Sequence, residues 1–329
     1  MQAESSERGA ALLTVLLLVA VISVLAAGAL EKLRLSTRLA ENGAAMEQAR
    51  AFAYATETVA TIRVNAILGQ DAARTTLQGG WAGHPFAITV PGGQATLTVA
   101  DGDNCFNLNG LVGETQQSGV YTAQQDQVLE FIRLMKLVGI PGQSADGIAA
   151  ATADWIDSDG NPLPNGAEDT AYLGKAPHYR AANTLMTDIS ELRAIAGVTS
   201  DIYAKLAPWV CTLPTAKPSM INVNTLEPEQ APLLAMLFPD TMDVSKARAL
   251  LLARPVTGYG STDEFWQQPV LANLNADMNV KSQQTGVRTY WFNLKIDINA
   301  NDVQLSQTDL LDATGQRAQI VSRAWSDPA

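Results

Sequence analysis

The sequence predicts an α+β fold in which a long N-terminal helix and an antiparallel sheet are interrupted by a large all-helical insertion. An uncharged apolar run covers residues 10–30 and continues into a helical pattern. Alternating apolar and polar residues occur in two distant stretches, near residue 90 and beyond residue 289. The terminal strands can pair only with each other and with the early strands. We therefore expect one sheet, with the helical residues 123–285 inserted into it.

The apolar run is the first element. Residues 10–30 contain no charged side chain, and at about 1.5 Å per residue a helix over them spans about 30 Å, the thickness of a bilayer's hydrocarbon core. A buried helix of a soluble protein would normally keep a polar face, and this run has none. A secretory signal peptide would have a shorter apolar region. We expect a retained transmembrane segment that follows a leader of residues 1–9.

The charges around this segment favour one orientation. Arg8 precedes it, offset by Glu4 and Glu7, whereas basic residues follow it at positions 32, 34 and 38. Counted by the positive-inside rule, this distribution favours a cytoplasmic location for the rest of the chain.

Residues 31–122 are expected to hold the remainder of the helix and the first strands. Apolar residues at spacings of three and four continue the helix to a stop at Gly69, and Asn42-Gly43 is a candidate kink. Residues 86–90 and 94–99 alternate around Pro91-Gly92-Gly93, which predicts a hairpin. A short third extended stretch follows at residues 105–109.

The insertion and the terminal strands complete the chain. An apolar stripe from Val128 to Val138 predicts a helix, and further helices are expected at 228–237 and 244–254. Ser261 to Glu264 forms a capping box that begins another helix. In the final segment, residues 286–329, strands are expected at 289–298 and 317–324.

Composition argues against a nucleic-acid ligand. The formal net charge is −11, whereas binding to phosphates requires clustered Lys and Arg. Residues 222–265 resemble a helix-hairpin-helix unit, but the connection 238–242 has no glycine to offer backbone amides to phosphate. We interpret this unit as a packing or protein-contact element, and a DNA-uptake receptor remains the weakest alternative.

The chain has only two cysteines, Cys105 and Cys211. Both follow the transmembrane segment. Outside the cytosol they could form a disulfide, whereas in a reducing compartment they would be two small hydrophobic residues.

An acidic loop over residues 157–168 has the spacing of a calcium site. Asp157, Asp159, Asn161 and Glu168 occupy relative positions one, three, five and twelve, the offsets at which a Ca²⁺ loop supplies oxygen ligands. Pro162 takes the sixth position, where an EF-hand needs glycine, so the loop must fold differently. Asp154 and Asp169 lie close enough in sequence to contribute. The alternative is a solvated turn.

No residue pattern indicates catalysis. The two histidines, His84 and His178, have no Cys or second His at ligand spacing, and the nucleophile-elbow, zinc-protease and phosphate-loop motifs are missing from the sequence. The aromatic residues at 155, 209, 265 and 266 are expected in the core. A membrane-anchored calcium-dependent hydrolase, with the acidic loop near a reactive site, remains the alternative function.

Several strings in order along nearly the whole chain resemble the K-type minor pseudopilin family of the type II secretion system. These strings are the leader ending in Gly9 before the apolar helix, Phe106-Asn107-Leu108-Asn109-Gly110, Ala153-Asp154-Trp155-Ile156-Asp157-Ser158-Asp159, Gly166-Ala167-Glu168-Asp169, Tyr179-Arg180-Ala181-Ala182-Asn183 and Ile221-Asn222-Val223-Asn224-Thr225.

The resemblance implies a type IV pilin-like fold whose insertion binds one or two Ca²⁺ ions, with Asp157, Asp159, Asn161, Glu168 and Asp169 as the expected ligands. It implies assembly with the I- and J-type minor pseudopilins at the pseudopilus tip, contact with the other pseudopilins and the inner-membrane secretion platform, and no catalytic residues.

The resemblance also implies cleavage by prepilin peptidase between Gly9 and Ala10. The mature protein is then a single-pass protein of the bacterial inner membrane with its large domain in the periplasm. That location overrides the local charge count, because leader-bearing pilins are inserted by their own route. It also favours a bridge between Cys105 and Cys211.

One position departs from ordinary pilins. Most carry Glu at the fifth mature position, where its carboxylate can neutralise the amino terminus of a neighbouring subunit, but numbering from Ala10 places Thr14 there. A buried ammonium without a partner is costly, so such a subunit is poorly suited to follow another in the fibre. The expectation is a subunit that caps the tip and nucleates assembly.

Overall fold

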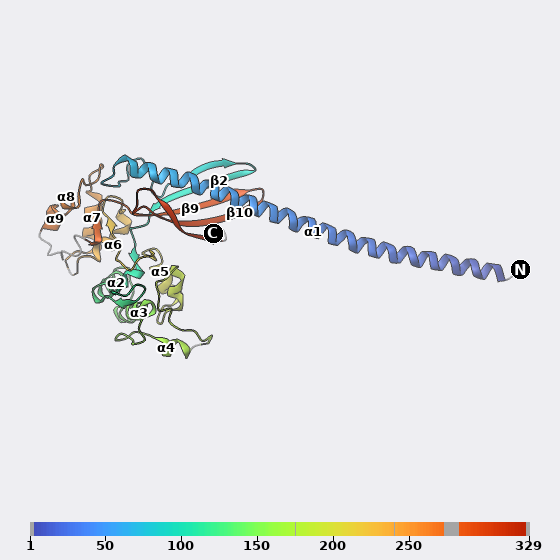
Figure 1. Ribbon diagram of the computed structural model, residues 1–329, viewed down its shortest axis with the longest axis horizontal. Coiled ribbons are helices and arrows are strands. Elements are labelled where there is room, and N and C mark those ends of the chain that lie inside the picture. Colours follow the sequence, from blue (N-terminus) through green and yellow to red (C-terminus); the bar gives the residue numbers. More distant parts are fainter. Residues whose placement is uncertain (1–2, 175, 240, 273–282, 327–329) are drawn as a thin grey trace.

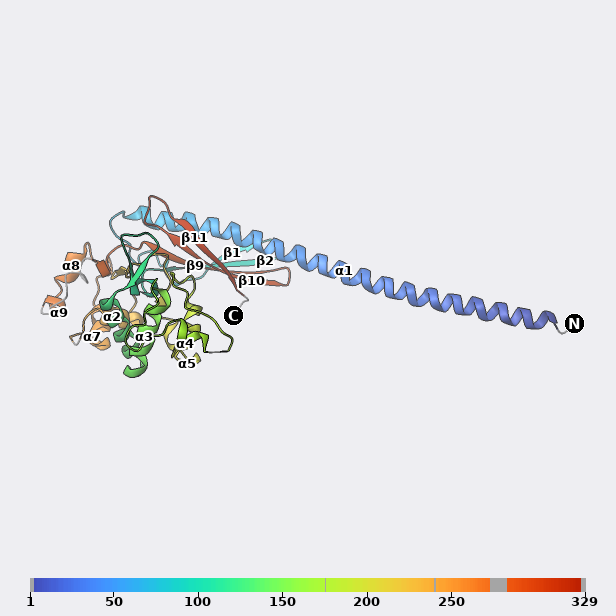
Figure 2. The same cartoon turned by 60° about the horizontal axis from the view of Figure 1, so that its bottom comes forward.

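The computed structural model describes residues 3–174, 176–239, 241–272 and 283–326. A long helix lies along a five-stranded antiparallel sheet, and a body of short helices is attached to the sheet (Figure 1). In the views of Figure 1 and Figure 2, α1 runs along one side of the sheet, and helices α2 to α5 lie on the other side. The predicted pilin-like α+β fold with a helical insertion is confirmed.

Helix α1 covers Ala3–Gln70 without interruption. Its first half extends away from the body (Figure 1), and the apolar side chains there have no protein neighbours, as the 69% exposure of Leu17 indicates. Within the described residues, this helix is long and apolar enough to cross a membrane. The helix continues through Asn42-Gly43, so the predicted kink is wrong, and it ends one residue after the predicted stop at Gly69.

The second half of α1 packs on the sheet through small side chains. Ala49, Ala53 and Ala60 are at most 1% exposed, which allows the helix axis to approach the strands closely. Val64 and Ile67 complete this face. Their partners in the first hydrophobic core include Leu97, Val99, Phe292, Leu294, Ile296 and Ile298.

The sheet has the strand order β1-β2-β9-β10-β11. These strands are β1 (Phe86–Val90), β2 (Gly93–Asp101), β9 (Trp291–Ala300), β10 (Val303–Asp312) and β11 (Gln319–Ser326). Asn301 and Asp302 have φ values of 51° and 62°, as a two-residue hairpin turn requires. Gly92 in the β1–β2 turn accepts a hydrogen bond from the Asn301 amide at 3.1 Å. A Cβ at Gly92 would lie 2.0 Å from Asn301 Oδ1, so glycine is needed where the two turns meet.

Four of these strands were expected and one was not. Strands β1 and β2 form the predicted hairpin, and β9 and β11 lie close to the predicted 289–298 and 317–324. Strand β10 was missed because Gln307 and Asp309 occupy its buried face, where the sequence pattern requires apolar residues. Gln307 Nε2 donates to both Asp309 oxygens, at 2.7 and 2.8 Å, and to Glu57 on α1 at 2.9 Å.

The insertion leaves the sheet after Asp101 and returns at Trp291. The division at residues 123 and 285 stays a prediction. Its helical elements are η1 (Leu108–Leu111), α2 (Gln125–Leu137), α3 (Gly142–Ile156), α4 (Asp169–Leu173), η2 (Ile189–Ala194), α5 (Ser200–Leu206), η3 (Pro228–Gln230), α6 (Ala231–Ala235), α7 (Val244–Leu252), α8 (Thr262–Trp266) and α9 (Pro269–Ala272). Its short strands are β3 (Phe106–Asn107), β4 (Val112–Glu114), β5 (Tyr121–Ala123), β6 (Val210–Cys211), β7 (Ile221–Asn222) and β8 (Thr285–Gly286).

The insertion has a second hydrophobic core of its own, which includes Phe106, Phe131, Leu134, Trp155, Tyr172 and Phe265. Strand pairs β3–β6 and β7–β8 are parallel and join segments that are distant in sequence. The helix predicted at 228–237 is divided into η3 and α6, with prolines at the start of both. The predicted start of α8 is confirmed, since Ser261 Oγ accepts a hydrogen bond from the Glu264 amide at 3.2 Å.

A disulfide joins Cys105 and Cys211 beside the β3–β6 pair. The predicted bridge between these cysteines is therefore supported. It connects the beginning of the insertion, just after the sheet, to a segment 106 residues later.

A buried polar cluster connects the sheet to the insertion. We call Asp101, Asp103, Asn104, Asn222, Thr225 and Thr289 the junction cluster; Asp101 is half-buried and the other five are at most 6% exposed. Asp101 Oδ2 accepts hydrogen bonds from the hydroxyls of Thr225, at 2.6 Å, and Thr289. Asp103 Oδ2 accepts from the amides of Tyr290 and Trp291, where the chain returns to the sheet.

Asn104 and Asn222 extend the junction cluster to α1. The Asn222 amide donates to Asn104 Oδ1 at 2.9 Å, and Asn222 Nδ2 donates to the carbonyl oxygen of Thr75, just beyond α1, at 3.1 Å. Burial raises the pKa of Asp101 and raises that of Asp103 well above its usual value, with the Asp101 charge adding to the second shift. The cluster thus holds the exit, the return and the end of α1 together.

The disulfide gives the first testable prediction. Closing a loop of this length removes conformational freedom from the unfolded chain, and the chain-entropy account gives about 5 kcal/mol of stabilisation. We expect alkylation of the unreduced native protein to label no cysteine, and Cys105→Ala/Cys211→Ala to lower the unfolding free energy by about that amount in denaturant titrations. Two alkylated thiols in the unreduced native protein would contradict the bridge.

The buried carboxyl of β10 gives a second prediction. Burial raises the pKa of Asp309 to about 6, from 3.8. Between these values the folded protein binds more protons than the unfolded chain, so this residue makes stability fall as pH rises from about 4 to 6, by up to about 3 kcal/mol. The substitution Asp309→Asn should remove the contribution of this residue to the fall in unfolding free energy between about pH 4 and pH 6.

The measurement is the unfolding free energy of the variant and the wild type at each pH in this range. Asp146→Asn, which removes an exposed carboxylate, is the control and should follow the wild type. If Asp309→Asn also follows the wild-type profile, Asp309 is ionised in the folded protein and the explanation fails.

Candidate metal centre

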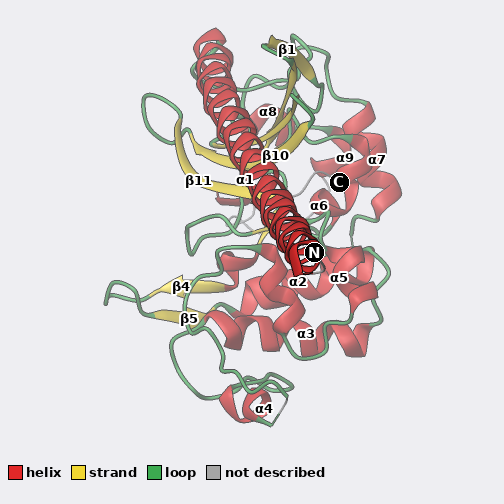
Figure 3. Cartoon of the chain, turned by 90° about the vertical axis from the view of Figure 1, so that its right-hand side faces the viewer, coloured by secondary structure: helices red, strands yellow, loops and turns green. Residues whose placement is uncertain are grey.

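The acidic loop connects two helices of the insertion. Asp157 is the C-cap of α3, and Glu168 is the N-cap of α4. In Figure 3, α4 lies at the edge of the insertion farthest from β1. The negative end of the α3 dipole adds to the negative potential around Asp157, so the loop begins where a cation is favoured.

Three carboxylates of the loop converge. One oxygen from each of Asp157, Asp159 and Glu168 lies within 4.8 Å of the others. Two oxygens on opposite sides of a Ca²⁺ ion, each about 2.4 Å from it, are about 4.8 Å apart, so the three atoms can share one ion. Asp157 is 3% exposed, Glu168 is 4% exposed and Asp159 is exposed, which leaves one open side.

The convergent oxygens need a positive partner. Asp157 Oδ1 and both oxygens of Glu168 are buried and have no hydrogen-bond donor among the described residues. Burial, followed by the charges of Asp159 and Asp154, raises the pKa of Asp157 to about 7. Burial and the charge of Asp154 raise the pKa of Glu168 to about 7 as well. Buried carboxylates without donors are costly, and a hard cation is the ligand that removes this cost.

Asp154 on α3 holds the loop in place. Its oxygens accept from the amide of Leu163, at 3.0 and 3.2 Å, and Oδ2 accepts from the amide of Ala167 at 2.7 Å. A Cβ at Gly166 would lie 1.9 Å from Asp154 Oδ2, so only glycine permits this contact. Asn165, with φ of 66°, makes the sharp turn that Pro162 cannot make at the EF-hand position.

Two other expected ligands have different neighbours. Asp169 forms an ion pair with Arg180 at 3.0 Å, and its second oxygen accepts from the Ala181 amide at 3.1 Å. Asn161 is exposed, and its amide donates to Asp159 Oδ1 at 2.7 Å, which orients Asp159 within the loop. The structure therefore brings Asp157, Asp159 and Glu168 together, and the roles of Asn161 and Asp169 as ligands stay predictions.

The residues singled out near the N-terminus all lie on α1. The Gly9–Ala10 peptide bond is part of the helix. Thr14 is exposed, and its hydroxyl donates to the carbonyl oxygen of Ala11 at 2.8 Å, so the helix's own backbone satisfies it. Position 14 thus carries a neutral side chain, which cannot form an ion pair.

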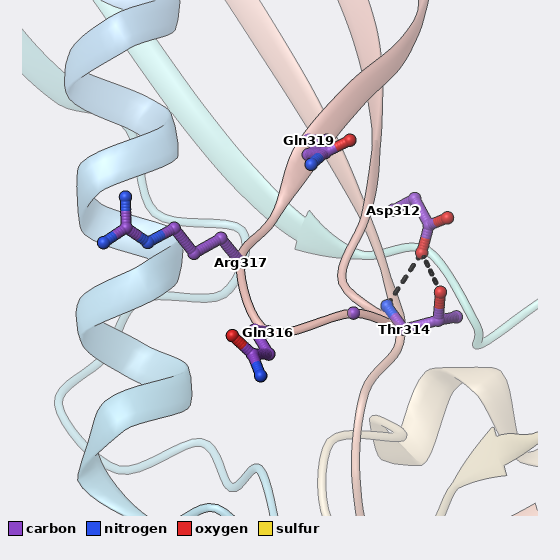
Figure 4. Close-up of a pocket in the computed structure, with 6 residues that line it drawn as sticks. Asp312, Thr314, Gln316, Arg317 and Gln319 are labelled. Carbon is purple, nitrogen blue, oxygen red and sulfur yellow. Dashed lines mark hydrogen bonds between the residues drawn. The ribbon is translucent and has the colours of Figure 1, made fainter.

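The remaining candidates have structural environments. His84 and His178 are exposed. In the unit 222–265, α6 and α7 pack through buried leucines, in agreement with a packing role. A hollow of about 420 Å³ at the β10–β11 turn is lined by Asp312, Thr314 and Arg317 (Figure 4). There Thr314 donates to Asp312 through its amide and hydroxyl, and Arg317 extends toward α1, so we interpret the hollow as a feature of the turn.

Besides Asp309, two sets of buried or half-buried acids were not singled out from the sequence. Asp101 and Asp103 of the junction cluster follow an alternating strand, and only their period-two spacing with Val99 could have indicated burial. Glu130 lies on the buried side of α2, and its neighbour Gln284 is 154 residues away, so no local signal existed.

Known proteins of one family are similar to this chain. Family descriptions of the type II secretion system (T2SS), protein K, match residues 104–215 and 221–288. The type II secretion system protein K of Pectobacterium carotovorum subsp. carotovorum is 36% identical over 98% of this chain and 97% of its own length. The protein of the same name from Klebsiella pneumoniae is 35% identical over 97% of this chain and 96% of its own length.

A solved structure gives the same result for the fold. The crystal structure of the GspK-GspI-GspJ complex from the enterotoxigenic Escherichia coli type 2 secretion system contains a chain that matches with a TM-score of 0.74 and 31% sequence identity. The match covers 86% of this chain and 97% of that chain. The similarity includes the pilin-like sheet as well as the insertion, because it extends over most of both chains.

Proposed function

The chain belongs to the type II secretion system protein K family, and from that premise we propose that it is the minor pseudopilin that caps the pseudopilus tip and nucleates its assembly. Its role is to support protein export across the outer membrane. The observation that carries the proposal is the combination, in one chain, of an exposed apolar helix, a pilin-like sheet and a large insertion beside that sheet.

The proposed location is the bacterial inner membrane, with one transmembrane segment and the large domain in the periplasm. The exposed apolar part of α1 supports a single-pass anchor. The Cys105–Cys211 disulfide supports an oxidising compartment for the domain. In this location prepilin peptidase would remove residues 1–9 before assembly.

Two features support a terminal place in the fibre. The insertion widens the head, and a wide head is easier to accommodate at a tip than within a packed shaft. Thr14 has no carboxylate to neutralise the amino terminus of a preceding subunit. Leaving that ammonium buried without a partner would cost several kcal/mol, on the order of 3 or more, so a first position is favoured.

The proposed partners are the I- and J-type minor pseudopilins, followed by the other pseudopilins and the inner-membrane platform. The similar solved chain is part of a complex of GspK, GspI and GspJ, and this chain shares its fold over most of its length. The role is structural and requires no catalytic residue.

We further propose that the acidic loop binds Ca²⁺. Asp157, Asp159 and Glu168 would hold the ion through carboxylate oxygens, with Asn161 and Asp169 as the additional expected ligands. The ion would supply the positive charge that the buried oxygens of Asp157 and Glu168 lack. Asp154 would keep the loop in position through its hydrogen bonds with the amides of Leu163 and Ala167, without contacting the ion.

Co-purification tests the assembly role. When the full chain is extracted in detergent from cells that also express the I- and J-type partners, we expect the three proteins to elute together. Extraction from cells lacking the J-type protein is the control for unspecific association. Elution of this chain alone, in a folded state and with both partners present, would contradict the proposal.

Processing gives a further prediction. Because the peptidase requires a small residue before the cut, replacing Gly9 with a bulky residue should leave the leader attached. Mass measurement of the membrane-extracted chain should show a wild-type protein that begins at Ala10 and a Gly9→Leu protein that keeps residues 1–9. A wild-type chain with any other first residue would refute the leader assignment.

Removal of the bound ion should destabilise the folded protein. A ligand that binds only the folded state stabilises it by about 2.7 kcal/mol at a free concentration one hundred times its dissociation constant. Chelation should therefore lower the melting temperature of the wild type. Asp157→Asn/Glu168→Gln removes two charges at nearly constant shape, so it should abolish the response to calcium and weaken co-purification with the partners.

The matched control is Asp146→Asn/Glu229→Gln, which also removes two negative charges but from exposed positions outside the loop. It should respond to calcium as the wild type does. If elemental analysis finds no bound calcium and chelator does not change the melting temperature, the loop is a solvated turn and the calcium proposal is wrong.

A further inference from the structure

The junction cluster contains two acidic side chains in one site. Asp103 is 2% exposed, and Asp101, two residues before it at the end of β2, is half-buried. The amide of Asp103 donates to Asp101 Oδ1 at 2.8 Å, so the two residues are linked directly. Two like charges in a site that is largely shielded from water repel each other strongly unless a cation or a proton is held with them.

Asp101 is surrounded by hydrogen-bond donors. Its Oδ2 accepts from the hydroxyls of Thr225, at 2.6 Å, and Thr289. Thr225 Oγ1 in turn accepts from Asn104 Nδ2 at 3.0 Å. Thr289 Oγ1 accepts from Asn222 Nδ2 at 2.8 Å. The hydroxyl hydrogens can therefore point to Asp101, and because both of its oxygens face donors, the arrangement suits an ionised carboxylate.

Asp103 has fewer donors. Its Oδ2 accepts from the amides of Tyr290 and Trp291, and no described residue donates to its Oδ1. Asp103 also lines a hollow of about 570 Å³, which gives protons a route from the solvent to this side chain. The second oxygen can carry a proton while the first keeps both amide bonds.

No cation among the described residues offsets a second charge in this site. Burial, followed by the charge of Asp101, raises the pKa of Asp103 well above its usual value, and only the amides of Tyr290 and Trp291 lower it. Lys217 lines the same hollow, but it is exposed and forms no ion pair with either acid in the described part of the chain. The other charged side chains on the neighbouring segments are exposed or have other partners: Glu227 is exposed, Arg74 pairs with Asp71, Arg254 donates to the carbonyl oxygens of Val223 and Leu226, Arg288 donates to that of Ala72, and Asp312 accepts from Thr314.

We propose that Asp101 and Asp103 together hold one proton in the folded protein, carried by Asp103, and that this proton makes the junction cluster a pH-sensitive connection between the sheet and the insertion. A neutral Asp103 beside an ionised Asp101 keeps the exit from β2 and the return to β9 in contact. When the proton is lost, any opening that brings Asp103 into water is favoured, because the second charge is then hydrated. The connection is firm in acidic medium and loosens as the pH rises. It depends neither on the calcium loop nor on a place at the tip.

Hydrogen exchange of the full chain in detergent reports on this opening. The reporter is the segment 289–292, which contains the two amides that donate to Asp103. After correction for the intrinsic pH dependence of exchange, the wild-type opening constant should rise about tenfold per pH unit above about pH 5, until the pKa of Asp103 in the folded protein is passed. In Asp103→Asn the constant should stay level, because asparagine keeps an acceptor for both amides and carries no charge at any pH.

Asp101→Asn is the matched variant. It removes the same charge two residues away, but its amide nitrogen places donors against the donors that already face Asp101. We therefore expect a melting temperature several degrees lower than that of the wild type at every pH, whereas Asp103→Asn keeps the wild-type value in acidic medium. The control, Asp146→Asn, removes an exposed charge on α3 and should follow the wild type in both measurements. If Asp101→Asn fails to fold, the exchange profile of Asp103→Asn decides the question.

Three results would overturn the inference. Parallel pH profiles of exchange in the wild type and Asp103→Asn would show that Asp103 is ionised in the folded protein. An unchanged melting temperature of Asp101→Asn, with a lowered one for Asp103→Asn, would place the proton on Asp101 instead. Failure of Asp103→Asn to fold would show that the site requires a charge at this residue. Each of these results leaves co-purification with the I- and J-type partners unaffected.

Discussion

The hydrogen bonds that Asp101 and Asp103 accept within the junction cluster are the interaction on which the arrangement of the molecule depends. The chain has two hydrophobic cores, one between α1 and the sheet and one inside the insertion. The exit after Asp101 and the return at Trp291 meet at these bonds, and Asn222 of the same cluster donates to Thr75, just beyond α1. Because the carboxylates are buried, separating the two bodies would expose or orphan several polar groups at once. The insertion is therefore held in one orientation relative to α1.

This constraint connects the two proposed roles. A head that projects in a fixed direction can define the end of a fibre, whereas a head on a flexible linker could fold back along the shaft. The disulfide joins Cys105, at the beginning of the insertion, to Cys211 farther along it. The acidic loop connects α3 to α4. A cation at Asp157 and Glu168 would stabilise the connection between α3 and α4 at an outer edge of the insertion.

The sequence predicted the features that are local and missed those that are not. The transmembrane segment, the hairpin at Gly92 and the acidic loop are each formed by one continuous stretch of sequence. Their residue patterns can therefore be recognised without a structure. Strand β10 was missed because its buried face carries Gln307 and Asp309; Gln307 donates to Asp309 and to Glu57, which lies 250 residues away. The burial of Glu130 on α2 was missed for the same reason, because Glu130 is paired with a residue of the opposite end of the insertion. Buried polar residues with distant partners break the apolar pattern on which sequence-based prediction depends.

The most direct test of the central claim is the position of this chain in assembled pseudopili. Gold-labelled antibody against the insertion, applied to isolated fibres and viewed by electron microscopy, reports where the head lies. The account predicts label at one end of each fibre and none along the shaft. Label distributed along the shaft would show that the wide head and the neutral Thr14 are tolerated at internal positions, and would contradict a subunit specialised for the tip.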